Sequence, residues 1–314
     1  MKGHPELPVL VSGASGHLGR LTVNSLLDRF GVPADQIIAT TRTPEMIDDF
    51  AKRGVNVRQV DFEDPRTVKR EFTGARRALI ISITPDEAGY EPGRRSRLQA
   101  KAVEAARQAG VPHVLLTSAP NAETGNPAFW HAAHYATEQV LINSGLKWTI
   151  LRNWDWPNFH WYTHWKPALE RGWYSTAAGN GGSSYIAKED TAAAAAGALV
   201  SDVSVNRLFN LTGPEVLSTD DVFALLHDLT GKTVRIKHLT PEEWEKDFLE
   251  NGGDKFWVSI MHAHMEAQKG GFFGGISNAV EELSGSQPTT MREYLPGLMA
   301  KDLTEEIGAY RRSD

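Results

Sequence analysis

Three glycines near the start of the chain have the spacing of a phosphate-binding turn. Gly13, Gly16 and Gly19 lie in the segment GASGHLG, which follows the apolar run Leu7–Ser12 and precedes the amphipathic stretch Leu18–Phe30. A strand, a glycine-rich turn and a helix in this order bring backbone amides and the positive end of a helix dipole to a pyrophosphate. Because the glycines stand in the context that the motif requires, they predict a dinucleotide site rather than an ordinary turn.

The residue that separates NADH from NADPH is expected about 20 positions after such a turn. There the chain reads ATTRT, from Ala39 to Thr43, with no carboxylate and with Arg42 at the end of the second apolar run. A carboxylate would repel a 2′-phosphate, whereas a guanidinium binds it through two hydrogen bonds. We therefore expect NADP(H) as the cofactor, and the alternative for Arg42 is a solvated surface cation.

A second group of residues, around His134 and Tyr135, offers chemistry for proton transfer. In the pattern Tyr-x-x-x-Lys a lysine lowers the pKa of a tyrosine, but after Tyr135 the lysine position holds Gln139. A phenol without such help has a pKa near about 10 and donates a proton poorly at neutral pH. On a helix, Glu138 would share a face with His134 and fix its tautomer. His134, supported by Tyr135, is therefore the expected acid or orienting donor, and the alternative is an exposed or helix-packing histidine.

The segment Asn153–Tyr174 is unusually aromatic. It holds five of the nine tryptophans of the chain and directly follows the last strand-like run of the first half. Stacked indoles suit a flat aromatic substrate, and their N–H groups add directional contacts. The alternative is that several of these rings pack a lobe interface or a homodimer interface. The residues expected to bind substrate are Trp130, Trp154, Trp156, Phe159 and Trp161.

Histidine pairs raise the question of a metal site. His160 and His164 have helical ligand spacing, and His131 lies three residues before His134. The positions between His160 and His164 supply no carboxylate of the HExxH kind, so we expect no metal. The chain has no cysteine, which excludes disulfides and thiolate ligands, and it has no G-x-S-x-G elbow of a serine hydrolase.

Charge and hydropathy exclude further classes of protein. Lys and Arg number 33 against 39 Asp and Glu, for a net charge of −6, which argues against a general nucleic-acid binder. The longest strongly apolar stretch, Ala192–Val200, is less than half of the about 20 residues that cross a membrane. Met1–Pro8 lacks the apolar core of a secretory signal. We expect a cytoplasmic protein with no nucleic-acid or membrane partner.

The elements that must position these residues alternate between strand and helix in the first half of the chain. Apolar runs separated by helical patterns indicate parallel strands that are buried on both faces and joined by right-handed crossovers. The expected strands are Leu7–Ser12, Gln36–Thr41, Val55–Val60, Ala78–Ile83, His113–Ser118 and Trp148–Leu151.

The alternation ends after Leu151. The predicted fold class is α/β, with a doubly wound parallel sheet in residues 1–155 and a smaller, mostly helical substrate lobe in residues 156–314. The segment 187–213, with a helical pattern and then the strand-like Arg207–Leu211, is expected to return to the sheet.

Several motifs along the chain together resemble the NmrA-like atypical short-chain dehydrogenases. They are GASGHLG, TTRTP, VRQVDFED, LLTS at Leu115–Ser118, LRN at Leu151–Asn153 and the late segments that begin at Gly271 and Pro288. Within that family the chain is similar to the bacterial quinone oxidoreductases of the second type and to triphenylmethane dye reductases. The likeness extends over nearly the whole chain.

The resemblance implies a Rossmann domain with specific cofactor contacts. All of the implied residues fall at or just after the carboxyl ends of predicted strands, where open α/β sheets bind ligands. For Ser82 and Ser118 the alternative is a strand-end hydroxyl that satisfies backbone groups. The implied contacts are Gly13, Ser15, Gly16, His17 and Leu18 at the pyrophosphate, Arg42 at the 2′-phosphate, Asp61 and Phe62 at the adenine, Ser82, Ile83 and Thr84 at the next strand end, and Ser118 and Asn153 toward the nicotinamide.

These features favour an enzyme, an NADPH-dependent oxidoreductase that transfers a hydride to a quinone-like or other aromatic acceptor. The reductases it resembles also lack the Tyr-Lys pair and keep a histidine at the position of His134. An electron-poor quinone or cationic dye accepts a hydride without obligatory protonation, so the protein mainly orients the two reactants. The alternatives are a non-catalytic NADP-sensing regulator and a reductase of a specific aromatic carbonyl or double bond assisted by Tyr135.

Overall fold

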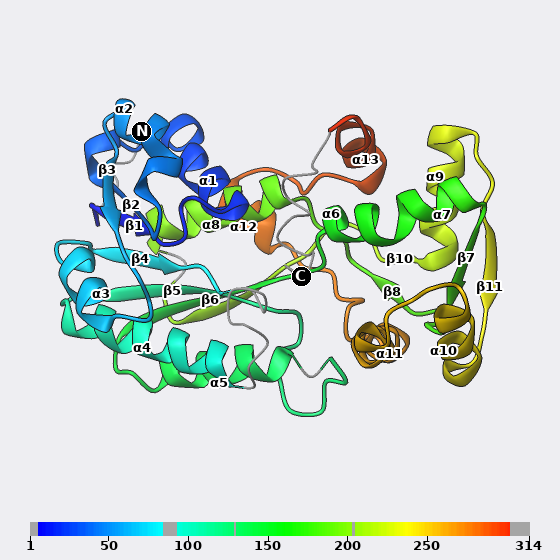
Figure 1. Cartoon of the computed structure of the whole chain (residues 1–314). Coiled ribbons are helices and arrows are strands. Elements are labelled where there is room, and N and C mark those ends of the chain that lie inside the picture. Colours follow the sequence, from blue (N-terminus) through cyan, green and yellow to red (C-terminus); the bar gives the residue numbers. More distant parts are fainter. Residues whose placement is uncertain (1–5, 84–92, 129, 203–204, 302–314) are drawn as a thin grey trace.

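A seven-stranded parallel sheet organises most of the chain (Figure 1). The computed structural model describes residues 6–83, 93–128, 130–202 and 205–301. The strands of the sheet are β1 Val9–Val11, β2 Ile37–Thr41, β3 Asn56–Gln59, β4 Arg77–Ile80, β5 His113–Ser118, β6 Lys147–Asn153 and β9 Arg207–Leu211. Their order is β3-β2-β1-β4-β5-β6-β9 and every neighbouring pair is parallel, which confirms the predicted doubly wound α/β sheet.

Helices cover both faces of the sheet because successive strand residues point to opposite sides. In β1, Val9 and Val11 belong to one apolar cluster and Leu10 belongs to another. The first cluster lies under α1 His17–Asn24, its continuation η1 Ser25–Arg29, α8 Lys188–Val200 and α12 Ala279–Ser284. The opposite face carries α3 Pro65–Phe72, α4 Arg94–Gln108 and α5 His131–Ile142 (Figure 1). Short helices η2 Ala34–Gln36, η3 Pro44–Ile47 and α2 Asp48–Lys52 connect β2 with its neighbours.

The aromatic segment, for which the sequence predicted no element, is helical. Pro157 begins the helix, a position that proline favours because its missing N–H would have no partner there. Three pieces follow without a break: α6 Pro157–His160, a turn of π-helix η4 Trp161–Trp165, and α7 Lys166–Arg171. A π-turn adds one residue to the usual spacing and is frequent at functional sites.

The remaining elements form a smaller lobe beside the sheet. Trp161, Trp165, Leu226 and Leu295 are buried in its core. The capping box Ser218–Asp221 begins its first long helix, and boxes of the same kind begin two further helices. The elements are β7 Trp173–Thr176, β8 Gly182–Ser183, β10 Leu217–Ser218, α9 Thr219–Thr230, β11 Arg235–His238, α10 Pro241–Glu250, α11 Lys255–Lys269 and α13 Met291–Ala300.

The C-terminal part of the chain does not stay in this lobe. α12 packs against α8, where a Cβ on Gly197 would lie 1.9 Å from the carbonyl oxygen of Leu283. Ala279, Val280 and Leu283 join the apolar cluster of the sheet. The sheet domain is therefore built from residues on both sides of the boundary that the sequence placed after residue 155.

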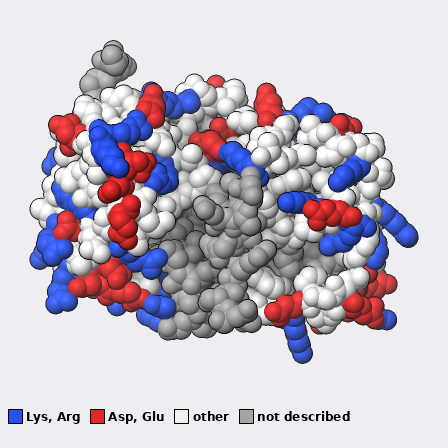
Figure 2. All heavy atoms as spheres, turned by 45° about the horizontal axis from the view of Figure 1, so that its top comes forward, with Lys and Arg blue, Asp and Glu red and all other residues white. Residues whose placement is uncertain are grey.

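The surface carries both charge signs. On the face in Figure 2, basic and acidic side chains are interspersed over the described part of the surface. Within the described ranges, no helix is long and apolar enough to cross a membrane.

Candidate active site

The glycine turn after β1 has the geometry that its sequence predicts. Gly13 has a φ of +62°, in the left-handed region that glycine adopts without strain. Gly16 caps α1, and its N–H donates to the carbonyl of Gly13 over 3.0 Å. A Cβ on Gly19 would lie 2.2 Å from the carbonyl oxygen of Gly13. Only glycine fits at Gly19, because the helix and the turn touch there.

Hydroxyl groups join this turn to the loop after β2. The Ser15 and Thr41 hydroxyl oxygens are 2.7 Å apart, and Thr41 Oγ1 also accepts from the backbone N–H of Thr43 over 3.2 Å. Arg42 lies exposed between these threonines, and its carbonyl accepts a hydrogen bond from Gln59 of the next strand. The backbone that carries the Arg42 guanidinium is thus held beside the glycine turn.

The next two strand ends are also shaped by local hydrogen bonds. The Asp61 carboxylate accepts from the N–H of Glu63 over 2.9 Å, and Phe62 packs partly buried against the α3 and α4 side of the sheet. After β4, the Ser82 N–H donates to Thr117 Oγ1 over 2.8 Å, and the Ile83 N–H donates to Gln99 over 2.9 Å. Thr84 lies outside the described residues.

A buried ion pair organises the ends of β5 and β6. Glu138 of α5 is 1% exposed and accepts from Arg152 of β6 over 2.8 and 2.9 Å. The Ser118 hydroxyl donates to the same carboxylate over 2.6 Å. Oε1 of Glu138 therefore accepts from both Arg152 and Ser118, and Oε2 accepts from Arg152. The expected Glu138–His134 pair is wrong, because the carboxylate turns toward the sheet.

His134 lies in a buried, positively biased environment. Its Nδ1 is buried without a hydrogen-bond partner among the described residues, and its ring meets that of His131 edge-on at 6.3 Å. Burial, with smaller contributions from Arg95, His131 and Arg152, holds the pKa of His134 well below its ordinary value. At neutral pH the ring is uncharged, so it can orient a ligand by hydrogen bonding but carries no imidazolium proton to donate. The neighbouring Tyr135 is partly buried.

Asn153 ends β6 and presents an unsatisfied group. The side chain is 8% exposed, and its Oδ1 is buried with no hydrogen-bond partner in the part of the chain that the structure describes. A buried acceptor without a partner costs free energy unless a ligand or water satisfies it. The end of β6 therefore offers a ready acceptor to a donor group of a ligand.

Lys188 is a residue near the turn that no sequence motif marks. It begins α8, is 7% exposed, and places its Nζ 3.3 Å from Nδ1 of His17. The same Nζ lies 5.2 Å from the ring centroid of Trp156. The fold thus brings a buried cation to the glycine turn from a helix that is distant in sequence. The signal in the sequence is a lone lysine before an alanine run, which by itself predicts nothing.

The tryptophans do not assemble the wall that the sequence predicts. Trp154 is 3% exposed in the core of the sheet domain, and its N–H donates to the carbonyl of Phe273 over 2.8 Å. Trp156 donates to the Thr191 hydroxyl over 3.1 Å, and Trp161 is buried in the core of the lobe. Trp154 and Trp161 are thus buried in two different cores, and Trp156 packs partly buried against the first of them.

Two of the other predicted substrate residues lie near a pocket of the lobe. Trp130 stacks with His264 at 6.5 Å between ring centroids. Phe159 meets His160 and His164 edge-on, each at 5.6 Å. The rings of Trp130 and Phe159 therefore pack against histidines that line the pocket, but they do not line it themselves.

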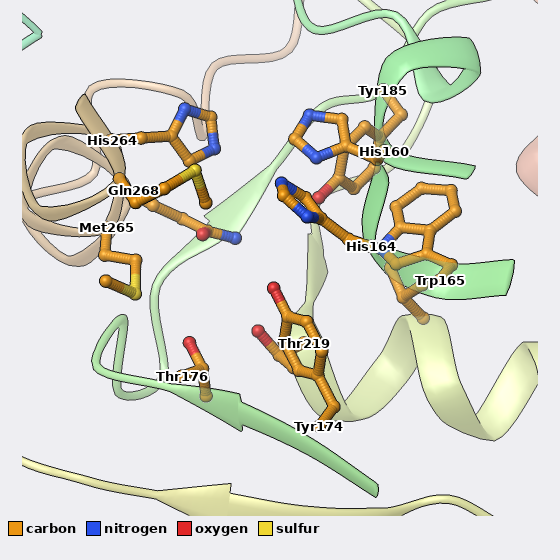
Figure 3. Close-up of a pocket in the computed structure, with 12 residues that line it drawn as sticks. His160, His164, Trp165, Tyr174, Thr176, Tyr185, Thr219, His264, Met265 and Gln268 are labelled. Atoms are coloured by element: carbon orange, nitrogen blue, oxygen red, sulfur yellow. The ribbon is translucent and has the colours of Figure 1, made fainter. Parts of the chain in front are cut away.

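The pocket lies between α11 and the helix that begins at Pro157 (Figure 3). Figure 3 shows His264, Met265 and Gln268 facing the pocket from α11, opposite His160 and His164. The enclosed free space between these side chains is only about 20 Å³, room for about one water molecule, and the value reaches about 390 Å³ only when the open solvent at its mouth is included. Trp165 is the only tryptophan among the described lining residues.

The walls of the pocket are uncharged at neutral pH. Burial lowers the pKa of His164 to about 4 and raises the pKa of Tyr174 to about 12. It also holds the pKa values of His160 and His264 below their ordinary range and raises that of Tyr185. Neutral rings, hydroxyls and thioethers are suited to a flat, polarisable ligand.

A continuous series of rings joins the pocket to His134. The centroid distances are 6.3 Å from His134 to His131, 5.8 Å from His131 to Phe273, 4.9 Å from Phe273 to His264 and 5.4 Å from His264 to His160. Two rings, Phe273 and His131, therefore lie between the pocket residue His264 and His134.

Comparisons with known proteins agree with this arrangement. A model of the NAD(P)H-binding family matches residues 13–202. Quinone oxidoreductase 2 of Escherichia coli is 30% identical over 291 residues, which are 92% of this chain and 98% of that protein. The NADPH complex of an E. coli NADPH-dependent quinone oxidoreductase has a TM-score of 0.83 at 28% identity, with 93% of this chain and 99% of that chain covered. Triphenylmethane reductase of Citrobacter sp., complexed with NADP(H), has a TM-score of 0.80 at 28% identity, with 92% and 99% covered.

Proposed function

The chain belongs to the NAD(P)H-binding family, and on that basis we propose that it is a reductase that transfers a hydride from NADPH to a quinone-like or other aromatic acceptor. The relatives named above, a quinone reductase and a dye reductase, support this activity, and they confirm the resemblance that the motifs indicate. NADPH would supply the hydride, and the protein would hold and orient the two reactants.

The cofactor would lie along the carboxyl ends of the strands. The glycine turn and the N-terminus of α1 would hold the pyrophosphate, with Ser15, His17 and Leu18 beside it. The guanidinium of Arg42 would bind the 2′-phosphate. Lys188 adds a cation at the same turn, since its Nζ lies 3.3 Å from His17. Asn153 Oδ1, buried without a partner among described residues, would accept from the carboxamide N–H of the nicotinamide.

The acceptor would bind between the nicotinamide side of the sheet and the neutral pocket of the lobe. A hydride brings two electrons to a quinone and leaves NADP⁺, and the hydroquinone anion takes its proton from solvent. These reaction steps need no imidazolium as a proton donor, which agrees with the lowered pKa of His134. We assign His134 the role of a neutral hydrogen-bond donor that orients the acceptor, with Tyr135 beside it.

A single observation carries the proposal. The glycine turn, Arg42 and Asn153 lie at the carboxyl ends of β1, β2 and β6, parallel strands of one sheet, and an uncharged pocket of aromatic, histidine and methionine side chains lies in the adjoining lobe. An open α/β sheet binds its cofactor at this edge, and an acceptor must meet the cofactor where the two sites adjoin.

The test is the loss of NADPH absorbance with a panel of para-quinones, triphenylmethane dyes, aromatic ketones and enones. We expect turnover with quinones or dyes, and little with simple ketones, which need a proton donor. The alternative is an NADP-sensing protein, which Gln139 favours because it replaces the lysine of the Tyr-x-x-x-Lys pattern. Such a protein would bind NADPH and NADP⁺ but would not oxidise NADPH in the presence of any acceptor of the panel. A Tyr135-assisted reductase would lose activity in Tyr135→Phe, whereas quinone reduction would survive that change.

A further inference from the structure

Three side chains from separate elements meet beside the pocket. Asp155 follows β6, His160 ends α6, and His264 lies in the middle of α11. One oxygen or nitrogen from each lies within 4.8 Å of the other two. We propose that Asp155, His160 and His264 form a binding site for a divalent transition-metal ion, with zinc as its preferred occupant. His160 and His264 also line the pocket of the proposed reductase, so the metal site adjoins the acceptor side, but metal binding is tested below without any measurement of activity.

One of the candidate ligand atoms is buried without a partner in the described part of the chain. Oδ2 of Asp155 is buried and has no hydrogen-bond partner among the described residues. Its distance to Nε2 of His160 is 4.0 Å, which is too long for a hydrogen bond. A buried carboxylate oxygen in this position is costly unless a cation or a donor satisfies it. A metal ion between the carboxylate and the two rings removes that cost.

The ligand set selects the class of metal. Two imidazoles and a carboxylate suit zinc, cobalt, nickel or copper, whereas magnesium and calcium prefer oxygen ligands alone. A neutral imidazole binds a metal through the lone pair of one ring nitrogen, and His160 and His264 each offer one such nitrogen to the site.

The distances require a small closure of the site. Zinc bonds of about 2.0 Å in a tetrahedron separate neighbouring ligand atoms by about 3.3 Å. The present separations of up to 4.8 Å would therefore have to contract by up to roughly 1.5 Å when the ion binds. The three ligands leave a fourth position for water or another ligand.

From the sequence we weighed His160 and His164 as a pair of metal ligands and expected no metal. His160 and His164 share helical spacing, but the metal-ligating set replaces His164 with Asp155 and His264. His164 remains next to the site, with its ring centroid 5.7 Å from that of His160 and its Nε2 buried without a partner among described residues. His264 is distant in sequence, so only the folded chain brings it to the site.

The experiment titrates the metal-stripped, untagged full chain with Co²⁺ and follows the visible absorption of tetrahedral cobalt. We expect one ion per chain, displaced by Zn²⁺, and a rise in melting temperature with zinc. His264→Ala should weaken binding by more than about 100-fold, since loss of an outer-shell partner alone costs about 10- to 100-fold. His227→Ala is the control, because His227 is exposed on α9 away from the site.

A second variant covers a failure of His264→Ala to fold. Asp155→Asn keeps the shape of the side chain but removes its charge, and its melting temperature should no longer respond to zinc. The proposal is overturned if wild-type protein shows no cobalt absorption, or if Asp155→Asn and a folded His264→Ala bind cobalt as tightly as His227→Ala.

Discussion

At the scale of single residues, the site separates groups that carry charge from groups that are kept neutral. Arg42 and Lys188 place cations along the glycine turn and the loop after β2. His134 and the pocket histidines are held neutral by burial. These two environments would suit the phosphate groups of the proposed cofactor and the aromatic rings of the proposed acceptor, respectively.

Arg42 accounts for the expected preference for NADPH. Arg42→Ala should raise the Kd for NADPH by about 10- to 100-fold, because a charged hydrogen bond is worth about 1.5–3 kcal/mol. The Kd for NADH should change little, since NADH lacks the 2′-phosphate. Tryptophan fluorescence titration with both nucleotides measures the effect, and Arg66→Ala, an exposed arginine paired with Asp64, is the control. Equal losses for NADH and NADPH would refute this role.

We expect His134 to orient the acceptor in its neutral form, without a change of protonation near neutral pH. Because burial holds its pKa well below the ordinary value, the imidazole stays neutral from pH 6 to pH 8. His134→Gln should lower kcat/KM for the best quinone by about 5-fold, the worth of about one hydrogen bond, and leave the shape of the pH profile unchanged. A pH-dependent step near neutrality that disappears in His134→Gln would show that the histidine donates a proton.

At the scale of elements, the strand ends explain what could be predicted. Gly13, Gly16 and Gly19 mark their turn by spacing alone, because backbone conformation and close approach dictate glycine there. The strands were predictable since their apolar runs are buried on both faces. The helix at Pro157–Arg171 was not predicted, because the π-turn Trp161–Trp165 interrupts the ordinary helical spacing of its buried residues.

The Glu138 ion pair ties α5 to β5 and β6. Glu138→Ala should lower the free energy of unfolding by about 3–5 kcal/mol, because it leaves Arg152 without its buried partner. Glu104→Ala breaks an exposed pair with Arg107 on α4 and should cost less than about 1 kcal/mol. Urea denaturation compares the two variants, and equal losses would contradict a structural role for the buried pair.

At the scale of the whole molecule, the chain returns repeatedly to the sheet. α8 and β9 lie in the segment 187–213 that was expected to return to the sheet, and α12, which was not expected there, packs against α8. Contacts such as Lys188 with His17, or Asp155 with His264, join residues far apart in the chain. The spacing of residues along the chain does not reveal such contacts. Sequence patterns therefore predicted a cofactor site at the carboxyl ends of the strands, but not the places of the tryptophans or the histidines that line the pocket.

Buried neutral histidines should make the whole fold sensitive to acid. Burial lowers the pKa of His113 to about 4 and that of His131 to about 3, whereas both protonate near pH 6.5 in the unfolded chain. The unfolded state then binds more protons, so this stabilisation is complete above about pH 6.5 and is lost as pH falls toward the folded pKa values. When the pH falls from 6.5 to 5, each of the two histidines should lower the free energy of unfolding by about 2 kcal/mol.

Thermal and urea unfolding between pH 7 and pH 5 measure how steeply the free energy of unfolding falls with pH. His113→Gln should make this fall less steep, because the variant has one titrating group fewer. An unfolding free energy that stays constant from pH 7 to pH 5 would contradict the neutral state of these side chains.

The central claim is direct hydride transfer from NADPH to an aromatic acceptor in the pocket. Its most direct test is anaerobic single-turnover mixing of the NADPH-bound chain with para-quinones and triphenylmethane dyes, using NADPH that carries hydrogen or deuterium at C4 of the nicotinamide. We predict that NADPH absorbance is lost only when an acceptor is present, and that deuterium slows this loss. Bound NADPH that stays unoxidised with every quinone and dye would contradict the claim.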